Sequence, residues 1–395
     1  MRKTSEWVSL GHPDKVADYI SCYLLDRYLD RDPYTRFAVE VQIKDNYVTL
    51  GGEVTSKANY SSEDIAAFVR TAVNQIGYTS EYQKRWGKEN TICGDELVIT
   101  QHIGQQSSDI AQGVDNSGWG DQGIFHGMAV NTPETDYMPA DWYLAKKIGQ
   151  HLYDIRYAGL DIKTQVTMLD GKPEEIVVAI PMQMKHSSQD IANAVQWCCG
   201  GSKDYKLTVN GTGRFVKHGP IGDCGTTGRK LAVDFYGGNC VIGGGSPWTK
   251  DGTKADLSLN LLARARAVSH IQEHPDCPEV HCAISCRIGS PEILVVFTDK
   301  TGNELLSYRE NVTPAEVIRE FKLQKPHFAE MCRKADITEA LTEEITVSEG
   351  QIIYPDAEMV IYNTSGLNVT ALNGSLQPGV YVVFINGNTT KVMVR

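Results

Sequence analysis

The sequence reads HGPIGDCGTTGRK from His218 to Lys230 and GGGSPWTKDGTKAD from Gly243 to Asp256. Glycines at this density let backbone N–H groups approach an anion closely. Lysine and arginine side chains supply positive charge for phosphate oxygens, and the carboxylates among them are ligands that Mg²⁺ takes together with phosphates. The two stretches therefore predict a site for a polyphosphate and magnesium, and the rest of the chain is interpreted around them.

Length and composition limit the possible functions. A chain of 395 residues predicts two or three domains, and its 41% hydrophobic and 22% charged residues are typical of a soluble globular protein. The net charge of −11 argues against a nucleic-acid partner, which would need a basic face. No apolar run approaches the ~20 residues that cross a membrane, and the N-terminal residues lack the apolar core of a signal peptide. We therefore expect a cytoplasmic protein with no nucleic-acid or membrane partner.

The ten cysteines are scattered and form no Cys-x-x-Cys pair. This spacing fits neither a zinc site nor a disulfide framework. Reduced thiols, mostly packed in the interior, are the expectation. Cys224 lies inside the first glycine-rich stretch, but nothing near it in the sequence marks it as a reactive thiolate.

A second motif, Gly11-His-Pro-Asp-Lys15, precedes apolar residues at helical spacing. Proline is favoured in a first helical turn, so the motif is expected at a helix N-terminus, whose free amides and partial positive charge suit an anion. The alternative is that His12 and Asp14 only cap the helix.

The remaining pattern predicts strand pairs that alternate with helices. Residues 37–43 and 47–54 form the first expected hairpin, whereas the segment around Ser5 and the glycine-rich run 104–127 are expected to be loops, the second of them a lid. Further strands are expected at 96–103, 163–168, 176–180, 205–209, 282–286 and 293–297, and helices at 62–76, 142–157, 187–197, 257–271 and 314–321. This order predicts α+β sandwiches rather than a doubly wound sheet, followed by a small all-β appendage in the last ~45 residues.

Four motifs in order resemble the S-adenosylmethionine synthetase (methionine adenosyltransferase) family over about residues 3–300. They are Gly11–Lys15, Gly118-Trp-Gly-Asp-Gln-Gly123 and the two glycine-rich stretches. The resemblance implies three α/β sandwich domains related by pseudo-threefold symmetry, which we place at 1–108, 109–217 (with the lid) and 218–345, and a β-rich tail at 346–395. It also implies a homodimer with active sites at the subunit interface, and it allows a tetramer.

The reaction implied is attack of the L-methionine sulfur on C5′ of ATP, with release of tripolyphosphate that is then hydrolysed to phosphate and diphosphate. A thioether is already nucleophilic and needs no general base. The difficulty is the charged leaving group, which calls for preorganised cations and metal ions. The residue types in the four motifs agree with that requirement.

The family pattern assigns roles to individual residues. His12 would donate a hydrogen bond to the departing oxygen, Asp14 and Asp256 would hold two Mg²⁺ ions, and Glu40 matches the position of a K⁺ ligand. The residues implied in catalysis are His12, Lys163, Arg229, Lys230 and Lys250. Those implied in ATP binding add Asp161, Arg214, Phe215, Asp223, Ser246 and Lys254. Those implied in methionine binding are Glu53, Gln106, Asp223, Lys254 and Ile288, and Asp121 matches a further active-site acid.

The chain also departs from the family pattern. Leu10 replaces a usual Glu, Ser246-Pro-Trp-Thr249 replaces a usual Ala-Phe-Ser-Gly, the lid between Gln106 and Gly118 is shorter, and the match fades after about residue 300. None of these changes removes an expected ligand. Two alternatives stay open: a catalytically silent, ATP-binding regulatory partner of another synthetase, or a related enzyme that uses a methionine analogue.

Overall fold

The computed structural model describes residues 1–105, 118–334, 346–348, 351–353, 359–363, 367–385 and 388–394. The chain divides into two compact units, Met1–Thr338 and Glu339–Arg395. Residues 106–117 of the expected lid, Gln106 among them, lie outside the described residues. Within the described part, no helix is long and apolar enough to span a membrane, and all ten cysteines are free thiols.

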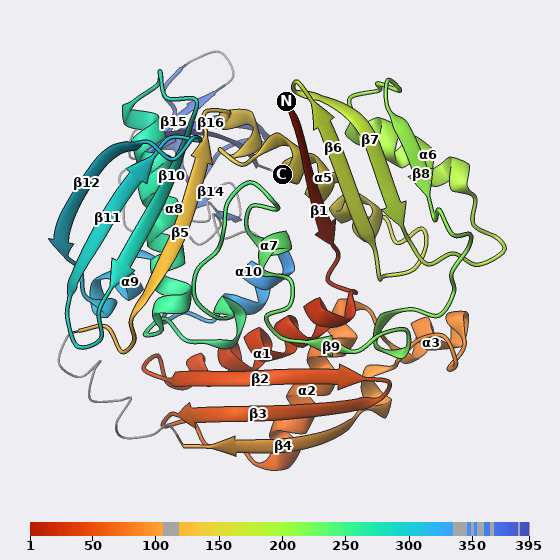
Figure 1. Cartoon of the computed structure of the whole chain (residues 1–395). Coiled ribbons are helices and arrows are strands. Elements are labelled where there is room, and N and C mark those ends of the chain that lie inside the picture. Colours follow the sequence, from red (N-terminus) through yellow and green to blue (C-terminus); the bar gives the residue numbers. More distant parts are fainter. Residues whose placement is uncertain are drawn as a thin grey trace. The chain divides into compact units, whose positions relative to one another are not determined.

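Three four-stranded sheets form the first unit (Figure 1). Their orders are β4-β3-β2-β9, β1-β6-β7-β8 and β12-β11-β10-β5. The strands are β1 Arg2–Val8, β2 Arg36–Lys44, β3 Tyr47–Thr55, β4 Val98–Gly104, β5 Gly123–Val130, β6 Lys163–Leu169, β7 Lys172–Ala179, β8 Lys206–Val209, β9 Gly225–Thr226, β10 Glu279–Cys286, β11 Glu292–Thr298 and β12 Glu304–Asn311. The helices are α1 Pro13–Leu29, α2 Ser62–Ile76, α3 Ser80–Trp86, α5 Ala140–Asp154, α6 Ser188–Cys198, α7 Leu231–Asp234, α8 Ala255–Glu273, α9 Pro314–Glu320 and α10 Phe328–Lys334.

The three sheets share one plan. Each contains an antiparallel hairpin (β2–β3, β6–β7 or β10–β11), and the helix before that hairpin (α1, α5 or α8) contacts it or its neighbouring strand. The strand ahead of each helix pairs not with the hairpin that follows that helix but with the hairpin of another sheet. The strand ahead of α1 is β1, which pairs with β6; the strand ahead of α5 is β5, which pairs with β10; and the strand ahead of α8 is β9, which pairs with β2. The exchange is cyclic, so the pseudo-threefold relation is visible in the topology although no repeat is visible in the sequence. The sheets therefore cross the expected boundaries 1–108, 109–217 and 218–345, which remain a proposal.

Two loop predictions were wrong. Residues Arg2–Val8 form β1, paired in register with β6 so that Ser5 lies opposite Val166. The run expected as a loop up to Gly127 ends earlier, because β5 begins at Gly123 and pairs with β10. Both strands are fixed by partners more than a hundred residues away, which a local pattern does not reveal. Helices α3 and α10 and strand β12 were also not predicted.

Helix α1 carries the Gly-His-Pro-Asp-Lys motif at its N-terminus, as expected. His12 is the N-cap, Pro13 opens the first turn, and nearly every residue of the helix is buried. The helix contacts β2, β9, α2 and α10, so it lies between elements from both ends of the first unit. This burial places the charged side chains of its first two turns, Asp14, Lys15 and Asp18, in the interior rather than in solvent.

Asp26, near the other end of α1, gives a pH-dependent prediction. Its carboxylate accepts the Phe328 and Ala329 N–H groups, both at 2.9 Å, at the start of α10, and burial raises its pKa to about 7 although these bonds lower it. Between about pH 4 and pH 7 the folded state therefore keeps a proton on Asp26, whereas the unfolded chain, in which the pKa is near 3.8, releases it. The free energy of unfolding thus falls as the pH rises through this range, by at most about 1.4 kcal/mol per pH unit.

Asp26→Asn removes this titration. We expect the melting temperature of the wild type, measured relative to that of the variant, to decrease between pH 4.5 and pH 7.5. A difference in melting temperature that stays constant over this range would contradict the prediction.

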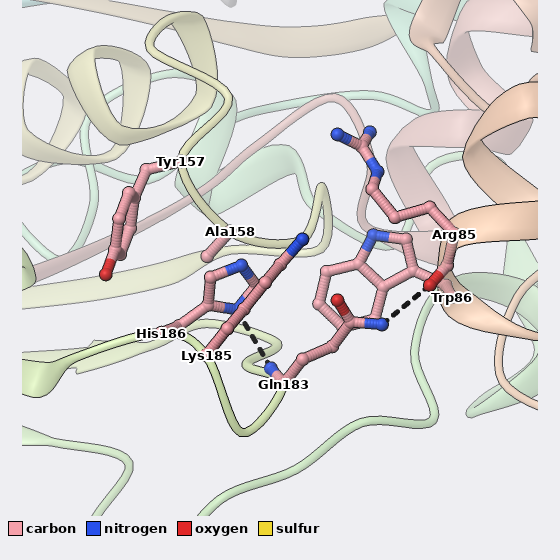
Figure 2. Close-up of a pocket in the computed structure, with 7 residues that line it drawn as sticks. All are labelled: Arg85, Trp86, Tyr157, Ala158, Gln183, Lys185 and His186. Atoms are coloured by element: carbon pink, nitrogen blue, oxygen red, sulfur yellow. Dashed lines mark hydrogen bonds between the residues drawn. The ribbon is translucent and has the colours of Figure 1, made fainter.

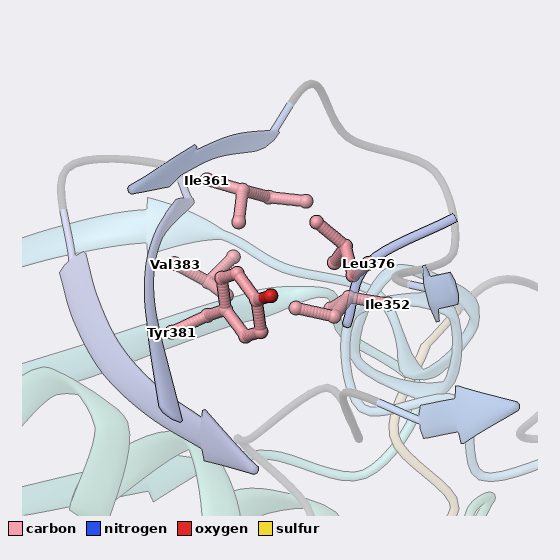
Figure 3. Packing of buried hydrophobic residues seen from close by; sticks show 5 residues of the cluster. All are labelled: Ile352, Ile361, Leu376, Tyr381 and Val383. Carbon is pink, nitrogen blue, oxygen red and sulfur yellow. The ribbon is translucent and has the colours of Figure 1, made fainter. Parts of the chain in front are cut away.

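The second unit contains the β-rich tail. Strands β15 Met359–Asn363, β16 Gly379–Ile385 and β17 Asn388–Val394 form one antiparallel sheet, and β13 Thr346–Ser348 pairs with β14 Gln351–Ile353. A small core of buried apolar side chains lies within this unit: Ile352, Ile361, Leu376, Tyr381 and Val383 (Figure 3). The expected all-β character of the tail is confirmed.

Candidate active site

His12 both caps α1 and presents a hydrogen-bond donor. Its Nδ1 accepts the Asp14 N–H at 3.2 Å, so in the neutral ring the proton is on Nε2. Burial, followed by the positive charges of Lys230 and Lys163, lowers the pKa of His12 to about 3, against the opposing effect of Asp14 and Asp223. His12 therefore caps the helix, and its neutral imidazole keeps an Nε2–H for which no acceptor is found among the described residues.

Asp14 lies beside the first glycine-rich stretch. Its carboxylate accepts the Thr226 N–H at 2.9 Å and pairs with Lys230 Nζ at 2.7 Å, and Arg229 lies 3.7 Å away. At Gly225 an added Cβ would be 2.1 Å from the Pro13 carbonyl oxygen, so only glycine allows β9 to approach α1 this closely. Burial raises the pKa of Asp14, but the bonds from Lys230 and Thr226 outweigh that effect and hold the pKa below its ordinary value.

Three further expected residues lie near His12 and Asp14. Asp161 accepts the Gly219 N–H at 2.9 Å, and burial raises its pKa to about 6. Lys163, exposed at the start of β6, and Asp223, whose carboxylate accepts the Cys224 N–H at 2.8 Å, both act electrostatically on His12. We call His12, Asp14, Asp161, Lys163, Asp223, Arg229 and Lys230 the first group.

A second group follows in the other glycine-rich stretch. Lys250 Nζ lies 2.5 Å from Asp256 Oδ2, and Asp256 Oδ1 accepts the Gly245 N–H at 2.6 Å. Lys254 Nζ is buried 4.0 Å from Asp251 and has no hydrogen-bond partner among the described residues. Burial lowers the pKa of Lys254, and an anion beside this ammonium would supply the missing acceptor.

Strand β2 holds the two groups at a fixed spacing. Thr226 pairs with Gln42, and Lys250 pairs with Ala38 in an isolated bridge. Four residues along a strand span about 13 Å. No hydrogen bond or ion pair between described side chains joins the groups directly, but Glu40 lies between them. Its carboxylate accepts the hydroxyls of Thr227 and of Thr249, the latter at 3.1 Å.

Arg214 and Phe215 lie in another part of the first unit. Arg214 donates to Met184 Sδ at 2.9 Å and to the His186 carbonyl at 3.4 Å, and the Phe215 carbonyl accepts the Met182 N–H at 2.9 Å. This segment borders a cavity of about 210 Å³ lined by Arg85, Trp86, Tyr157, Ala158, Gln183, Lys185 and His186 (Figure 2). The structure therefore does not bring the Arg214 side chain into contact with the first group.

The residues expected at methionine are near the second group or exposed. Glu53, exposed on β3, raises the pKa of Lys254, against the larger effect of burial. Ile288 is 62% exposed and forms a parallel bridge with the buried Trp119, close in sequence to the exposed Asp121.

Ser246, in the second glycine-rich stretch, lies against Gly228 of the first. It is buried, and its hydroxyl has no partner in the described part of the chain. An added Cβ at Gly228 would lie 2.9 Å from the Ser246 Cβ, so the two stretches touch here.

The carboxylates suit hard cations. Asp14 and Asp256 each bind one backbone N–H and one lysine ammonium, so each already has a cation at a carboxylate oxygen. Residues 1–105 and 118–334 contain no cluster of three His, Cys, Asp or Glu side chains that could hold a metal by themselves. Mg²⁺ held by one carboxylate and substrate phosphates needs no such cluster. The Glu40 carboxylate with the Thr227 and Thr249 hydroxyls is an all-oxygen donor set.

Sequence reasoning missed a buried network beside the site. Lys15, Asp18, Asp234 and Trp248 are all fully buried and bonded to one another. No local pattern marked this network, because charged residues within an apolar helical repeat ordinarily indicate a solvent-exposed face.

Comparison with known proteins identifies the family of the chain. The family models described as S-adenosylmethionine synthetase match in three parts: the N-terminal domain at residues 1–108, the central domain at 116–215 and the C-terminal domain at 217–345. Proteins named S-adenosylmethionine synthase are similar over 364 residues. That of Brachyspira hyodysenteriae is 34% identical (82% of this chain, 89% of the relative), that of Mesoplasma florum 34% (83% and 93%), and that of Zymomonas mobilis 36% (82% and 89%).

A solved structure is also similar. The structure described as an unusual S-adenosylmethionine synthetase from Campylobacter jejuni superposes with a TM-score of 0.74 at 30% sequence identity. The match covers 84% of this chain and 93% of the other.

Proposed function

Because the chain belongs to the S-adenosylmethionine synthetase family, we propose that it forms S-adenosyl-L-methionine from ATP and L-methionine. The observation that carries the proposal is the first group, in which the neutral His12 imidazole stands beside Asp14, Arg229 and Lys230 at a helix N-terminus. A hydrogen-bond donor and cations so placed match a reaction whose difficulty is the departure of a polyphosphate.

The chemical step is a displacement at carbon. The methionine sulfur donates an electron pair to C5′ of ATP, the C5′–O bond breaks, and its pair leaves with the tripolyphosphate. His12 Nε2–H donates to the departing oxygen. Lys163, Arg229, Lys230, Lys250 and Lys254 contact phosphate oxygens, and Asp161, Arg214, Phe215 and Ser246 contribute to the nucleotide site. Hydrolysis of tripolyphosphate to phosphate and diphosphate completes the cycle.

Members of this family use a divalent metal ion and potassium. Here two Mg²⁺ ions, held by Asp14 and Asp256, would supply positive charge to the triphosphate, and Glu40 would hold K⁺. The lysines that pair with these carboxylates, Lys230 and Lys250, would then be available to phosphate oxygens. The two carboxylates would thus pair with lysines in the free protein and with Mg²⁺ when the substrate is bound.

Methionine is assigned to the exposed acids and the second group. Glu53 and Asp223 would face its ammonium, Lys254 and Gln106 its carboxylate and neighbouring polar atoms, and Ile288 its apolar side chain. Asp121 is assigned as a further acid of the site.

We also propose a homodimer with active sites at the subunit interface, and a tetramer built from such dimers is compatible with it. The support is the family to which the chain belongs, since the resemblance implies active sites shared between two subunits. The free thiols fit the reducing cytoplasm, where ATP and methionine are available.

The test is an assay with ATP, L-methionine, Mg²⁺ and K⁺, followed by chromatography of the sulfonium product and measurement of phosphate and diphosphate. We expect one phosphate and one diphosphate for each S-adenosylmethionine formed. ATP binding without product would favour the silent regulatory partner, and product only with longer thioethers would favour the methionine-analogue enzyme.

The proposed K⁺ site predicts a selective effect of Thr249→Val. The variant keeps the shape of the buried side chain but removes the hydroxyl that donates to Glu40 at 3.1 Å. We expect the K⁺ concentration needed for half-maximal rate to rise several-fold, because an oxygen ligand and a partner of Glu40 are lost together. Thr164 is the control residue, since its buried hydroxyl donates to the Ala145 carbonyl. Thr164→Val should leave the K⁺ concentration for half-maximal rate unchanged. An equal response to K⁺ in both variants would refute the assignment of Glu40.

A further inference from the structure

We propose that Lys15 and Trp248 are positioning residues for the reaction, because through Asp18 and Asp234 they hold the loop of Arg229 and Lys230 and the loop of Lys250 in one fixed arrangement. The inference deepens the proposed function and rests on it. Neither residue belongs to the first or the second group, and neither is assigned a contact with substrate.

Lys15 is the centre of the network. Its side chain is 1% exposed, and its ammonium lies 2.8 Å from Asp234 and 3.2 Å from Asp18. It also lies 5.0 Å from the centre of the Trp248 ring, within cation–π range. Trp248 is itself 1% exposed and donates from Nε1 to the same Asp234 oxygen at 2.8 Å.

One side of the network fixes the loop before and after Arg229–Lys230. Asp18 accepts the Gly228 N–H at 3.0 Å, immediately ahead of Arg229. Asp234 ends α7, the short helix that starts directly after Lys230. Asp14 and Asp18, one turn apart on α1, therefore hold the N–H groups of Thr226 and Gly228, with the Lys15 ammonium between Asp18 and Asp234.

The other side fixes the loop that leads to Lys250. Trp248 precedes Lys250 by two residues, and its carbonyl accepts a hydrogen bond from Cys22 Sγ at 3.0 Å. Its indole N–H reaches Asp234 across to the first loop. Both loops are thus held by the same buried pair, the Lys15 ammonium and the Asp234 carboxylate. A shift of either loop would break a bond in the interior.

Stability alone is a weak explanation for such a network. Burying a charge costs several kcal/mol before partners compensate, and apolar replacements of buried ion pairs are often neutral or stabilising. A network that fixes two phosphate-binding loops gains precision at the site, where misplacement of a group by about 1 Å can cost about 10²-fold in rate. The two explanations differ in what a conservative substitution does to catalysis.

The test compares Trp248→Phe with Trp7→Phe. The control is Trp7→Phe: Trp7 is equally buried at 1%, its ring lies against Gly149 of α5, and its indole N–H has no partner among the described residues, so it bonds neither the network nor α7. Lys15→Met is the second variant, which removes the charge at similar length. The measurements are melting temperature, kcat and KM for ATP and for methionine, and calorimetric binding of inorganic tripolyphosphate with Mg²⁺.

We expect Trp248→Phe to lower kcat and to weaken tripolyphosphate binding by about tenfold or more, with the KM for methionine unchanged. Trp7→Phe should keep these values within about twofold at a similar loss of melting temperature. Equal losses in both tryptophan variants, or none, would overturn the proposal even if Lys15→Met fails to fold. If the wild type binds tripolyphosphate but forms no S-adenosylmethionine, the proposed function fails while the binding comparison still tests this inference.

Discussion

Lys250→Ala is expected to lower kcat for S-adenosylmethionine formation by roughly 10³, as for the loss of other cations that stabilise a departing phosphate chain. Lys250 Nζ pairs with Asp256, one of the two proposed magnesium ligands, as Lys230 pairs with the other, Asp14. The variant removes a positive charge that would stabilise the anionic leaving group, and among the described residues it leaves the Asp256 carboxylate with the Gly245 N–H alone. Both effects act on the step that breaks the C5′–O bond.

The fold should survive this change. Both members of the Lys250–Asp256 pair are about one-fifth exposed, and partly exposed ion pairs contribute little to stability. Lys206→Ala is the control, since Lys206 is 75% exposed, pairs with Glu175 and lies on β8 away from both groups. Steady-state kinetics and thermal melting of the three proteins decide the matter. A near-normal kcat for Lys250→Ala, or an equal fall in Lys206→Ala, would refute the role given to Lys250.

His12→Asn is expected to lower kcat by roughly 10² to 10³ with no loss of stability. Asparagine is a good N-cap residue, so its side-chain oxygen can accept the Asp14 N–H that His12 Nδ1 now accepts. It is too short to place a donor where the imidazole Nε2–H lies. The variant therefore keeps the structural role of His12 and removes only the proposed catalytic one.

His12→Ala completes this comparison. It removes both roles, so it should lose about 1 kcal/mol of stability through the missing cap and show the same kcat as His12→Asn. The measurement is kcat for each variant beside its free energy of unfolding. If kcat follows stability across the two variants, or if His12→Asn keeps the wild-type rate, His12 is only a cap.

Local sequence patterns predicted the longer helices and the hairpins well, but missed short helices such as α3 and α10 and the connecting strands. The helix after Pro13 was predictable because the cap, the proline and the apolar spacing agree. Strands β1 and β9 were not, since β1 is polar at Ser5 and β9 has only two residues, and both exist through pairing with distant hairpins. The fold class came from strand and helix order and from the family motifs, which are longer than any local pattern.

The motifs likewise gave the residues of the candidate site but not their arrangement. Asp14 and Lys230 are 216 residues apart in sequence and 2.7 Å apart in space, which no pattern of spacing foretells. The division into two groups along β2 depends on an isolated bridge at Ala38 and a two-residue strand at Thr226. Lys15 would be assigned to the surface by composition alone, and only the packing of α1 on both sides shows that it is buried.

The cyclic exchange of strands has a consequence for how the first unit assembles. Each structural repeat consists of a hairpin, the helix before it and the strand ahead of that helix. A fragment that ends between two repeats would carry a strand whose partner hairpin is missing, and its own hairpin would lack the strand that another repeat supplies. Its sheet would present unpaired backbone groups, which favour aggregation. The three repeats are therefore partners that complete one another, and we expect Met1–Thr338 to unfold in one cooperative transition, with limited proteolysis yielding no stable single repeat.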